Sequence, residues 1–248
     1  MKIERKTIPD IYNFCDSWCE RCLFTQRCQS YQVQVENGLN QPIDHNVTLL
    51  QQVTEAVALT KKYLERIRAT NAPTGLLPTD LQALEQQTLP VAPTRHPVAE
   101  LGHDYLRQTG DWLRNEKGLL QLAGYQQMHE VKLGIRTEDE ALHQLNALKD
   151  AWEMIKWYRT LIPVKTVAAL RLFDAPTGDA KLTDYYVGKA KLVLVCIDRS
   201  MLAWQTVMTG YPEKIDELLD VLALLNRIGR ELETLFPGAR AFKRPGLD

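Results

Sequence analysis

Apolar side chains recur at three- and four-residue intervals along most of this 248-residue chain. That spacing puts them on one face of a helix, whereas strands alternate apolar and polar positions. The pattern predicts helices over about 46–70, 119–131, 137–162, 164–173, 183–209 and 212–235. It also predicts a helix that begins at Pro97 and includes Trp112, and a short helix after Thr79-Asp80. The sequence therefore predicts an all-α fold, a multi-helix bundle.

Local signals support several of these helix boundaries. Asn46 is a favourable N-cap, and Pro97 and Pro212 are suited to a first helical turn. Thr137 to Glu140 has the form of a capping box, in which the first and last side chains bond each other's backbone N–H groups. Pro163 lacks an N–H group and is expected to separate the helix ending at Ile162 from a shorter one.

One segment has the composition of a buried strand. Residues 191–197 are apolar and β-branched, and Asp198 follows them as an acid often follows a strand in α/β proteins. No Gly, Pro or Asn separates this segment from the apolar residues 201–204, however, and so long an uninterrupted pattern favours a helix. We predict one continuous helix over 183–209, in which Gly188 and Ala190 mark a close contact with another helix.

Asp198 is a candidate functional or structural acid. Its neighbours one helical turn away are all apolar: Leu194, Val195, Met201 and Leu202. This setting predicts a buried carboxylate, which needs a partner. The candidate partners are Arg159, Arg171 and Arg227. An ion pair between core helices is the preferred interpretation, and an acid in a functional cleft is the alternative. Cys196 is expected to be a small buried hydrophobic residue.

Composition excludes some classes of protein. Thirty Lys and Arg residues against 31 Asp and Glu leave a formal net charge of −1, unlike the basic surface of a nucleic-acid-binding protein. The basic cluster of Arg240, Lys243 and Arg244 is expected to be a solvated tail. No secretory signal begins the sequence, and the longest apolar run, 192–197, is far below the roughly 20 residues that span a membrane. We expect a cytoplasmic protein that binds neither membrane nor nucleic acid.

The most informative motif is a cluster of cysteines. Cys15, Cys19, Cys22 and Cys28 have the spacing C-x3-C-x2-C-x5-C, and the fifth cysteine is far away in the chain. In a reducing compartment disulfides are disfavoured, and close thiolates are suited to zinc or to an iron–sulfur centre. The four cysteines are therefore predicted to bind one metal centre.

The spacing favours an iron–sulfur cluster over zinc. Structural zinc usually uses two C-x2-C pairs separated by a longer loop. A single short run of ligands resembles the loops that hold [4Fe–4S] clusters. Arg21 and Arg27 are expected to offset the charge of the cluster or to pair with nearby acids. Apolar residues in the loop are expected to shield the cluster from water or to pack on the body; they are Trp18, Leu23 and Phe24.

Two Glu-x-x-His pairs provide a different candidate site. Glu100 with His103, and Glu140 with His143, have the spacing that dimetal carboxylate proteins of the ferritin-like type use on helices. Bridging carboxylates would have to come from residues such as Glu55 and Glu153. Glu140 already belongs to the capping box, which explains it without a metal. The chain has no nucleophile elbow, phosphate-binding glycine loop, dinucleotide fingerprint or zinc-protease motif.

These observations predict a cysteine-rich metal-binding segment, residues 1–30, attached to a helical body, residues 46–248. The leading hypothesis is a [4Fe–4S] protein that transfers electrons or senses redox state together with a protein partner. The second hypothesis is a helical interaction protein stabilised by zinc. The third is a dimetal oxidase that uses the two Glu-x-x-His pairs.

Overall fold

The fold is known from a computed structural model that describes residues 6–36, 96–174 and 178–248. The predicted helix over 46–70 and the short helix after Thr79-Asp80 lie outside these ranges. The chain divides into two compact units. The first contains residues 1–12 and 17–89, and the second contains residues 13–16 and 90–248.

The described part of the first unit consists of short helices around the cysteine cluster. Two 3-10 helices, η2 (Cys19–Arg21) and η3 (Thr25–Arg27), precede the α-helix α1 (Gln29–Glu36). Another 3-10 helix, η1 (Ile11–Asn13), lies where the sequence passes from one unit to the other. The N–H of Ile8 donates to the carbonyl of Arg27 at 3.0 Å, which joins the start of this unit to the end of η3.

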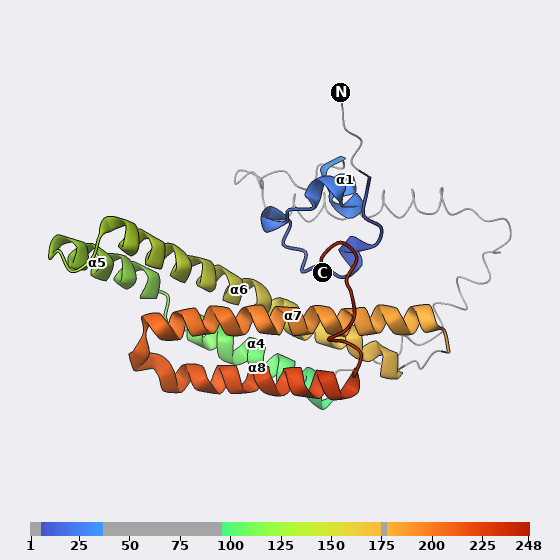
Figure 1. Cartoon of the computed structure of the whole chain (residues 1–248). Coiled ribbons are helices and arrows are strands. Elements are labelled where there is room, and N and C mark those ends of the chain that lie inside the picture. Colours follow the sequence, from blue (N-terminus) through green and yellow to red (C-terminus); the bar gives the residue numbers. More distant parts are fainter. Residues whose placement is uncertain (1–5, 37–95, 175–177) are drawn as a thin grey trace, which may run out of the picture. The chain divides into compact units, whose positions relative to one another are not determined.

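The second unit is a helical bundle (Figure 1). Its α-helices are α4 (Pro97–Asn115), α5 (Leu119–Lys132), α6 (Glu138–Asp174), α7 (Ala180–Gly210) and α8 (Ile215–Leu235), with the 3-10 helix η4 (Pro212–Lys214) before α8. Four of the helices form a closed ring, in which α6 packs on α7, α7 on α8, α8 on α4 and α4 on α6. The fifth, α5, packs along α6. The described residues contain no strand, so the all-α prediction is confirmed.

Aromatic side chains fill the centre of the ring. The Trp112 ring lies 5.6 Å from that of Trp152 and 5.0 Å from that of Trp204, measured between centroids. The indole N–H of Trp204 donates to the hydroxyl of Tyr105 at 3.4 Å. These side chains come from α4, α6 and α7 and bring large apolar areas together, which stabilises the ring.

Most of the predicted helix boundaries are confirmed. The Thr137 hydroxyl accepts from the N–H of Glu140, and the Glu140 carboxylate accepts from the N–H of Thr137, as a capping box requires. The segment 183–209 lies within α7 as one helix. Asp179 caps the start of α7 by accepting from the N–H of Lys181 at 2.9 Å. By length and composition α7 could cross a membrane, but core helices of bundles share both properties.

The predicted break at Pro163 is wrong, because α6 continues through this residue to Asp174. Pro163 is buried against α4, where a Cβ added to Gly102 would lie 3.2 Å from the proline Cα. The absent side chain of Gly102 lets α4 and α6 approach closely. We attribute the continuity of α6 to this packing, because it offsets the loss of the backbone hydrogen bond that proline cannot donate.

The predicted burial of Asp198 is also wrong. Its side chain is 48% exposed, and its partner is Arg240, at 2.5 and 3.2 Å, rather than Arg159, Arg171 or Arg227. The apolar neighbours on this face of α7 do not enclose it, because Leu202 is itself 63% exposed. Only the expectation of an arginine partner is correct.

The C-terminal basic cluster is ordered rather than a solvated tail. Arg240 also bonds Glu233 at 2.5 Å, and its carbonyl accepts from the Lys191 ammonium at 2.8 Å. Arg244 is buried and bonds Asp248, whose pKa it holds down at about 2 through hydrogen bonding. Arg240 and Lys243 are exposed, as predicted, but Arg240 is held by its ion pairs.

Gly188 allows a close contact on α7, but two aromatic rings make this contact rather than another helix. A Cβ at this position would overlap the ring of Phe14 and lie 2.9 Å from the ring of Phe242. The two rings also contact each other, with centroids 5.3 Å apart. The absence of a side chain at Gly188 therefore lets residues 13–16 and the C-terminal segment pack on α7.

We expect Gly188→Ala to lower the free energy of unfolding by about 1–3 kcal/mol, because the added methyl group displaces Phe14 and Phe242. Urea denaturation followed by circular dichroism measures the change. Gly210→Ala is the matched control, since a Cβ there meets no atom within 4 Å. Equal stability of Gly188→Ala and wild type would contradict this packing.

We expect Asp198→Ala to lower the free energy of unfolding by less than about 1 kcal/mol, because exposed ion pairs contribute little. The same denaturation experiment measures it. A loss of several kcal/mol would show that the carboxylate is buried in solution after all.

Candidate functional site

The four clustered cysteines are thiols rather than disulfides, and the backbone around three of them forms tight turns. Cys19 begins η2, and the N–H of Cys22 closes the turn by donating to the Cys19 carbonyl at 3.2 Å. Cys28 closes η3 in the same way, donating to the carbonyl of Thr25 at 3.3 Å. Cys28 is buried, and Cys15, Cys19 and Cys22 are half-buried.

One thiol already accepts a backbone hydrogen bond. The N–H of Phe24 donates to the sulfur of Cys22 at 3.4 Å. Amide donors to thiolate sulfur are among the contacts that tune the potential of an iron–sulfur cluster. Of the apolar residues expected to shield a cluster, Trp18 and Phe24 are half-buried and Leu23 is exposed.

The two arginines of the cysteine segment have local partners. The Arg21 guanidinium lies over the Trp18 ring, 4.4 Å from its centroid. The Nε of Arg27 donates to the carbonyl of Lys6 at 3.1 Å. Both side chains are exposed and carry positive charge within the segment, and their role beside a metal centre stays a prediction.

The structure does not show a formed metal site. Across residues 6–36, 96–174 and 178–248, no three His, Cys, Asp or Glu side chains are arranged to hold a metal ion. This finding includes Cys19, Cys22 and Cys28, which belong to the first unit. Cys15 belongs to the second unit and is described with it. Four-cysteine ligation therefore stays a prediction.

The fifth cysteine lies outside the cluster, as expected. Cys196 is buried in the middle of α7, and burial raises the pKa of its thiol well above the usual range. The thiolate that metal binding needs is therefore disfavoured there.

The Glu-x-x-His pairs are not brought together. Glu100 and His103 are exposed on α4, and His143 is exposed on α6. The Glu140 carboxylate is occupied by the capping box, whose hydrogen bonds lower its pKa. Glu153 bonds Lys156 at 3.2 Å, and Glu55 lies outside the described residues. Together with the absence of a metal-holding group among the described residues, these placements give the dimetal hypothesis no support.

A hydrogen-bonded network fixes the backbone next to Cys15. One carboxylate oxygen of Asp16 accepts from the Tyr158 hydroxyl at 2.8 Å and from the Arg199 guanidinium at 2.6 Å. The Asp16 carbonyl accepts from the indole N–H of Trp157 at 3.0 Å. The donors come from α6 and α7, so residues 13–16 are held on the bundle by both helices.

Lys189 is a buried cation near Cys15. Its ammonium donates to the carbonyl of Asn13 and lies 4.6 Å from the centroid of the Tyr185 ring. Burial lowers the pKa of Lys189, and the charge of a Cys15 thiolate acts in the opposite direction. The lysine is therefore placed to stabilise negative charge on Cys15. Lys189 lies within an apolar helical stripe, so nothing in the sequence indicates this role.

Comparison of the chain with protein-family models, with curated proteins and with solved structures finds no match. The functional argument therefore rests on the residues and contacts described above.

We expect Asp16→Ala to lower the free energy of unfolding by about 1–3 kcal/mol, because Tyr158 and Arg199 lose their shared acceptor. Urea denaturation measures the loss. Tyr158→Phe is the matched variant: it keeps the Asp16–Arg199 pair and should cost less. Wild-type stability of Asp16→Ala would show that the network does not hold residues 13–16 on the bundle.

Proposed function

We propose that Cys15, Cys19, Cys22 and Cys28 bind a [4Fe–4S] cluster, and that the protein transfers electrons or senses redox state in the cytoplasm together with a protein redox partner. The observation that carries the proposal is the clustering of four cysteine thiols within a short stretch of a chain whose fifth cysteine is buried elsewhere. Thiolates are the usual ligands of such clusters.

The donor set fits this centre. Four thiols match the four cysteine ligands that a [4Fe–4S] cluster takes. Phe24 supplies an amide donor to Cys22, and Lys189 supplies a positive charge near Cys15. We propose that metal binding draws the thiols together, because metal sites of small segments usually form only as the metal binds.

The bound cluster would supply a centre that gains and loses one electron. The residues of this chain would set its surroundings. Asp16, Tyr158 and Arg199 hold the backbone beside Cys15, so this ligand starts from a fixed position on the bundle. Lys189 and the arginines of the cysteine segment would offset the negative charge of a thiolate-ligated cluster, which raises its reduction potential.

A zinc-stabilised interaction protein is the second candidate. The C-x2-C turn from Cys19 to Cys22 is also a spacing that structural zinc uses. In addition, α5 presents exposed apolar side chains at three-residue spacing, Leu122, Tyr125 and Met128, which is a surface suited to a protein partner. In this case the metal would stabilise the segment and the function would belong to the helix surface.

Metal and sulfide analysis of anaerobically purified protein distinguishes the two candidates. If the protein binds a [4Fe–4S] cluster, it should be brown and contain about four irons and four sulfides per chain. If it binds zinc, the protein should be colourless and contain about one zinc per chain, and the zinc should remain bound in air. Absence of both metals from full-length protein reconstituted with iron, sulfide or zinc would contradict both candidates.

Substitution identifies the ligands. Serine at each of the four clustered positions should lower the metal content, because a hydroxyl is a far poorer ligand for these metals than a thiolate. Cys196→Ser is the matched control and should leave the metal content unchanged. Full metal content in the Cys15→Ser, Cys28→Ser double variant would show that the four cysteines are not one ligand set.

A further inference from the structure

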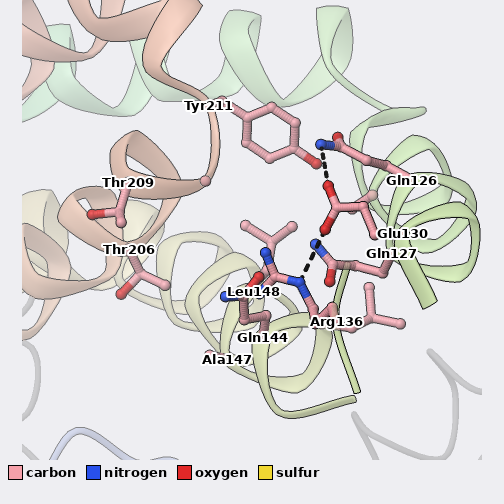
Figure 2. Close-up of a pocket in the computed structure, with 13 residues that line it drawn as sticks. Gln126, Gln127, Glu130, Arg136, Gln144, Ala147, Leu148, Thr206, Thr209 and Tyr211 are labelled. Atoms are coloured by element: carbon pink, nitrogen blue, oxygen red, sulfur yellow. Dashed lines mark hydrogen bonds and ion pairs between the residues drawn. The ribbon is translucent and has the colours of Figure 1, made fainter. Parts of the chain in front are cut away.

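The second unit contains a pocket that the cysteine site does not involve (Figure 2). Its volume is about 420 Å³, within the range of small-molecule sites. It lies where α5, the start of α6 and the end of α7 meet. The residues that line it are Ala123, Gln126, Gln127, Glu130, Arg136, Gln144, Leu145, Ala147, Leu148, Thr206, Thr209, Gly210 and Tyr211.

An ion pair occupies one wall of the pocket. The Nε of Arg136 donates to one oxygen of Glu130 at 2.9 Å, and the Gln126 amide donates to the other at 3.1 Å. Both contacts lower the pKa of Glu130 and so favour its ionised form, and the hydrogen bond from Gln126 has the larger effect. The side chains of Arg136 and Glu130 are only 25% and 19% exposed. The pair fixes the guanidinium in the wall and leaves the wall with no net charge.

Arg136 retains unused donors. Its contact with Glu130 uses Nε, and the described part of the chain offers no hydrogen bond to its two terminal nitrogens. A guanidinium edge of this kind binds a carboxylate or a phosphate through two parallel hydrogen bonds.

Gln127 provides an unused acceptor beside the ion pair. Its side-chain oxygen is buried and has no hydrogen-bond partner among the described residues. Figure 2 shows its amide next to Glu130 and Arg136. A buried acceptor without a donor costs free energy, so a ligand with an N–H or O–H group would be favoured here.

Apolar side chains and hydrogen-bond acceptors make up much of the remaining wall, which also includes the Gln144 amide. Ala123 and Leu148 are buried, and Leu145 lies beside them in the lining. The hydroxyls of Thr206 and Thr209 donate to carbonyls of their own helix, at 3.1 and 2.9 Å, so only their oxygen lone pairs remain for a ligand. The pocket therefore offers one anion-binding edge, several acceptors for a donor group, and an apolar surface.

We propose that this pocket binds a free α-amino acid with an apolar side chain, independently of the cysteine site. The carboxylate bonds the terminal nitrogens of Arg136, and the ammonium donates to Gln127. The apolar side chain lies against Leu145 and Leu148. A zwitterion leaves the neutral wall neutral, whereas phosphate or a simple carboxylate would add an uncompensated negative charge beside Glu130.

The test is a thermal-shift screen of the full-length protein with each common L-amino acid at millimolar concentration, followed by calorimetric titration of the best binder. At least one apolar amino acid should raise the melting temperature. Its amide and its desamino acid should each bind about 10- to 100-fold more weakly, because each lacks one charged hydrogen-bonding group. Inorganic phosphate should bind more weakly than the amino acid.

Two variants locate the site. Gln127→Leu should abolish binding without lowering the stability of the free protein, because it removes an unpaired buried acceptor. Arg136→Lys should weaken binding by losing the two-pronged contact. Gln121→Leu on α5 and Arg107→Lys on α4 are the matched controls and should bind as wild type does.

The proposal is overturned if no amino acid shifts the melting temperature. It is also overturned if phosphate or the desamino acid binds as tightly as the amino acid, or if Gln127→Leu retains full affinity. The cysteine variants should bind the amino acid normally, so failure here leaves the metal proposal untouched.

Discussion

The packing of α7 against α6 is the contact on which the second unit depends. The central part of α7 carries a nearly continuous set of buried side chains: Leu192, Val193, Leu194, Cys196 and Ile197. A helix that is apolar around so much of its circumference is stable in water only when several elements cover it. Here α6 and α8 flank it in the ring, and residues 13–16 and the C-terminal segment pack over its surface at Gly188. Apolar burial on α7 is therefore what brings both ends of the described second unit onto one helix.

Helix positions followed from the sequence because their causes are local. The capping box at Thr137 and the apolar spacing across 183–209 act within one or two turns, so they can be recognised without knowledge of the fold. The continuity of α6 at Pro163 does not follow from the sequence, for the opposite reason. What keeps α6 continuous is its contact with Gly102, 61 positions earlier, and proline by itself signals a break. Asp198 shows the same limit: its apolar neighbours are real, but nothing local shows that Leu202 faces solvent.

The candidate sites divide in a similar way. The cysteines were recognisable because thiol clustering is rare and chemically specific. The groups that hold Asn13 and Asp16 beside Cys15 were not, since Lys189, Tyr158 and Arg199 reach these two residues only through the packing of two helices on residues 13–16. The pocket gave no signal at all. Its Gln, Arg and Glu side chains resemble any solvated helix surface in the sequence, and only the meeting of three helices makes them the wall of one cavity.

The unequal lengths of α4 and α6 have a consequence for motion. With 37 residues, α6 is roughly 55 Å long, about twice the length of the 19-residue α4. Trp152 packs on Trp112 near the end of α4, so the part of α6 before Trp152 extends past α4, and α5, which buries only Leu119 and Ala123, covers it (Figure 1). Segments with so few buried contacts open at a lower free energy than the whole domain, and their amide hydrogens exchange sooner. The hairpin of α5 and the start of α6 should thus behave as a separately opening unit.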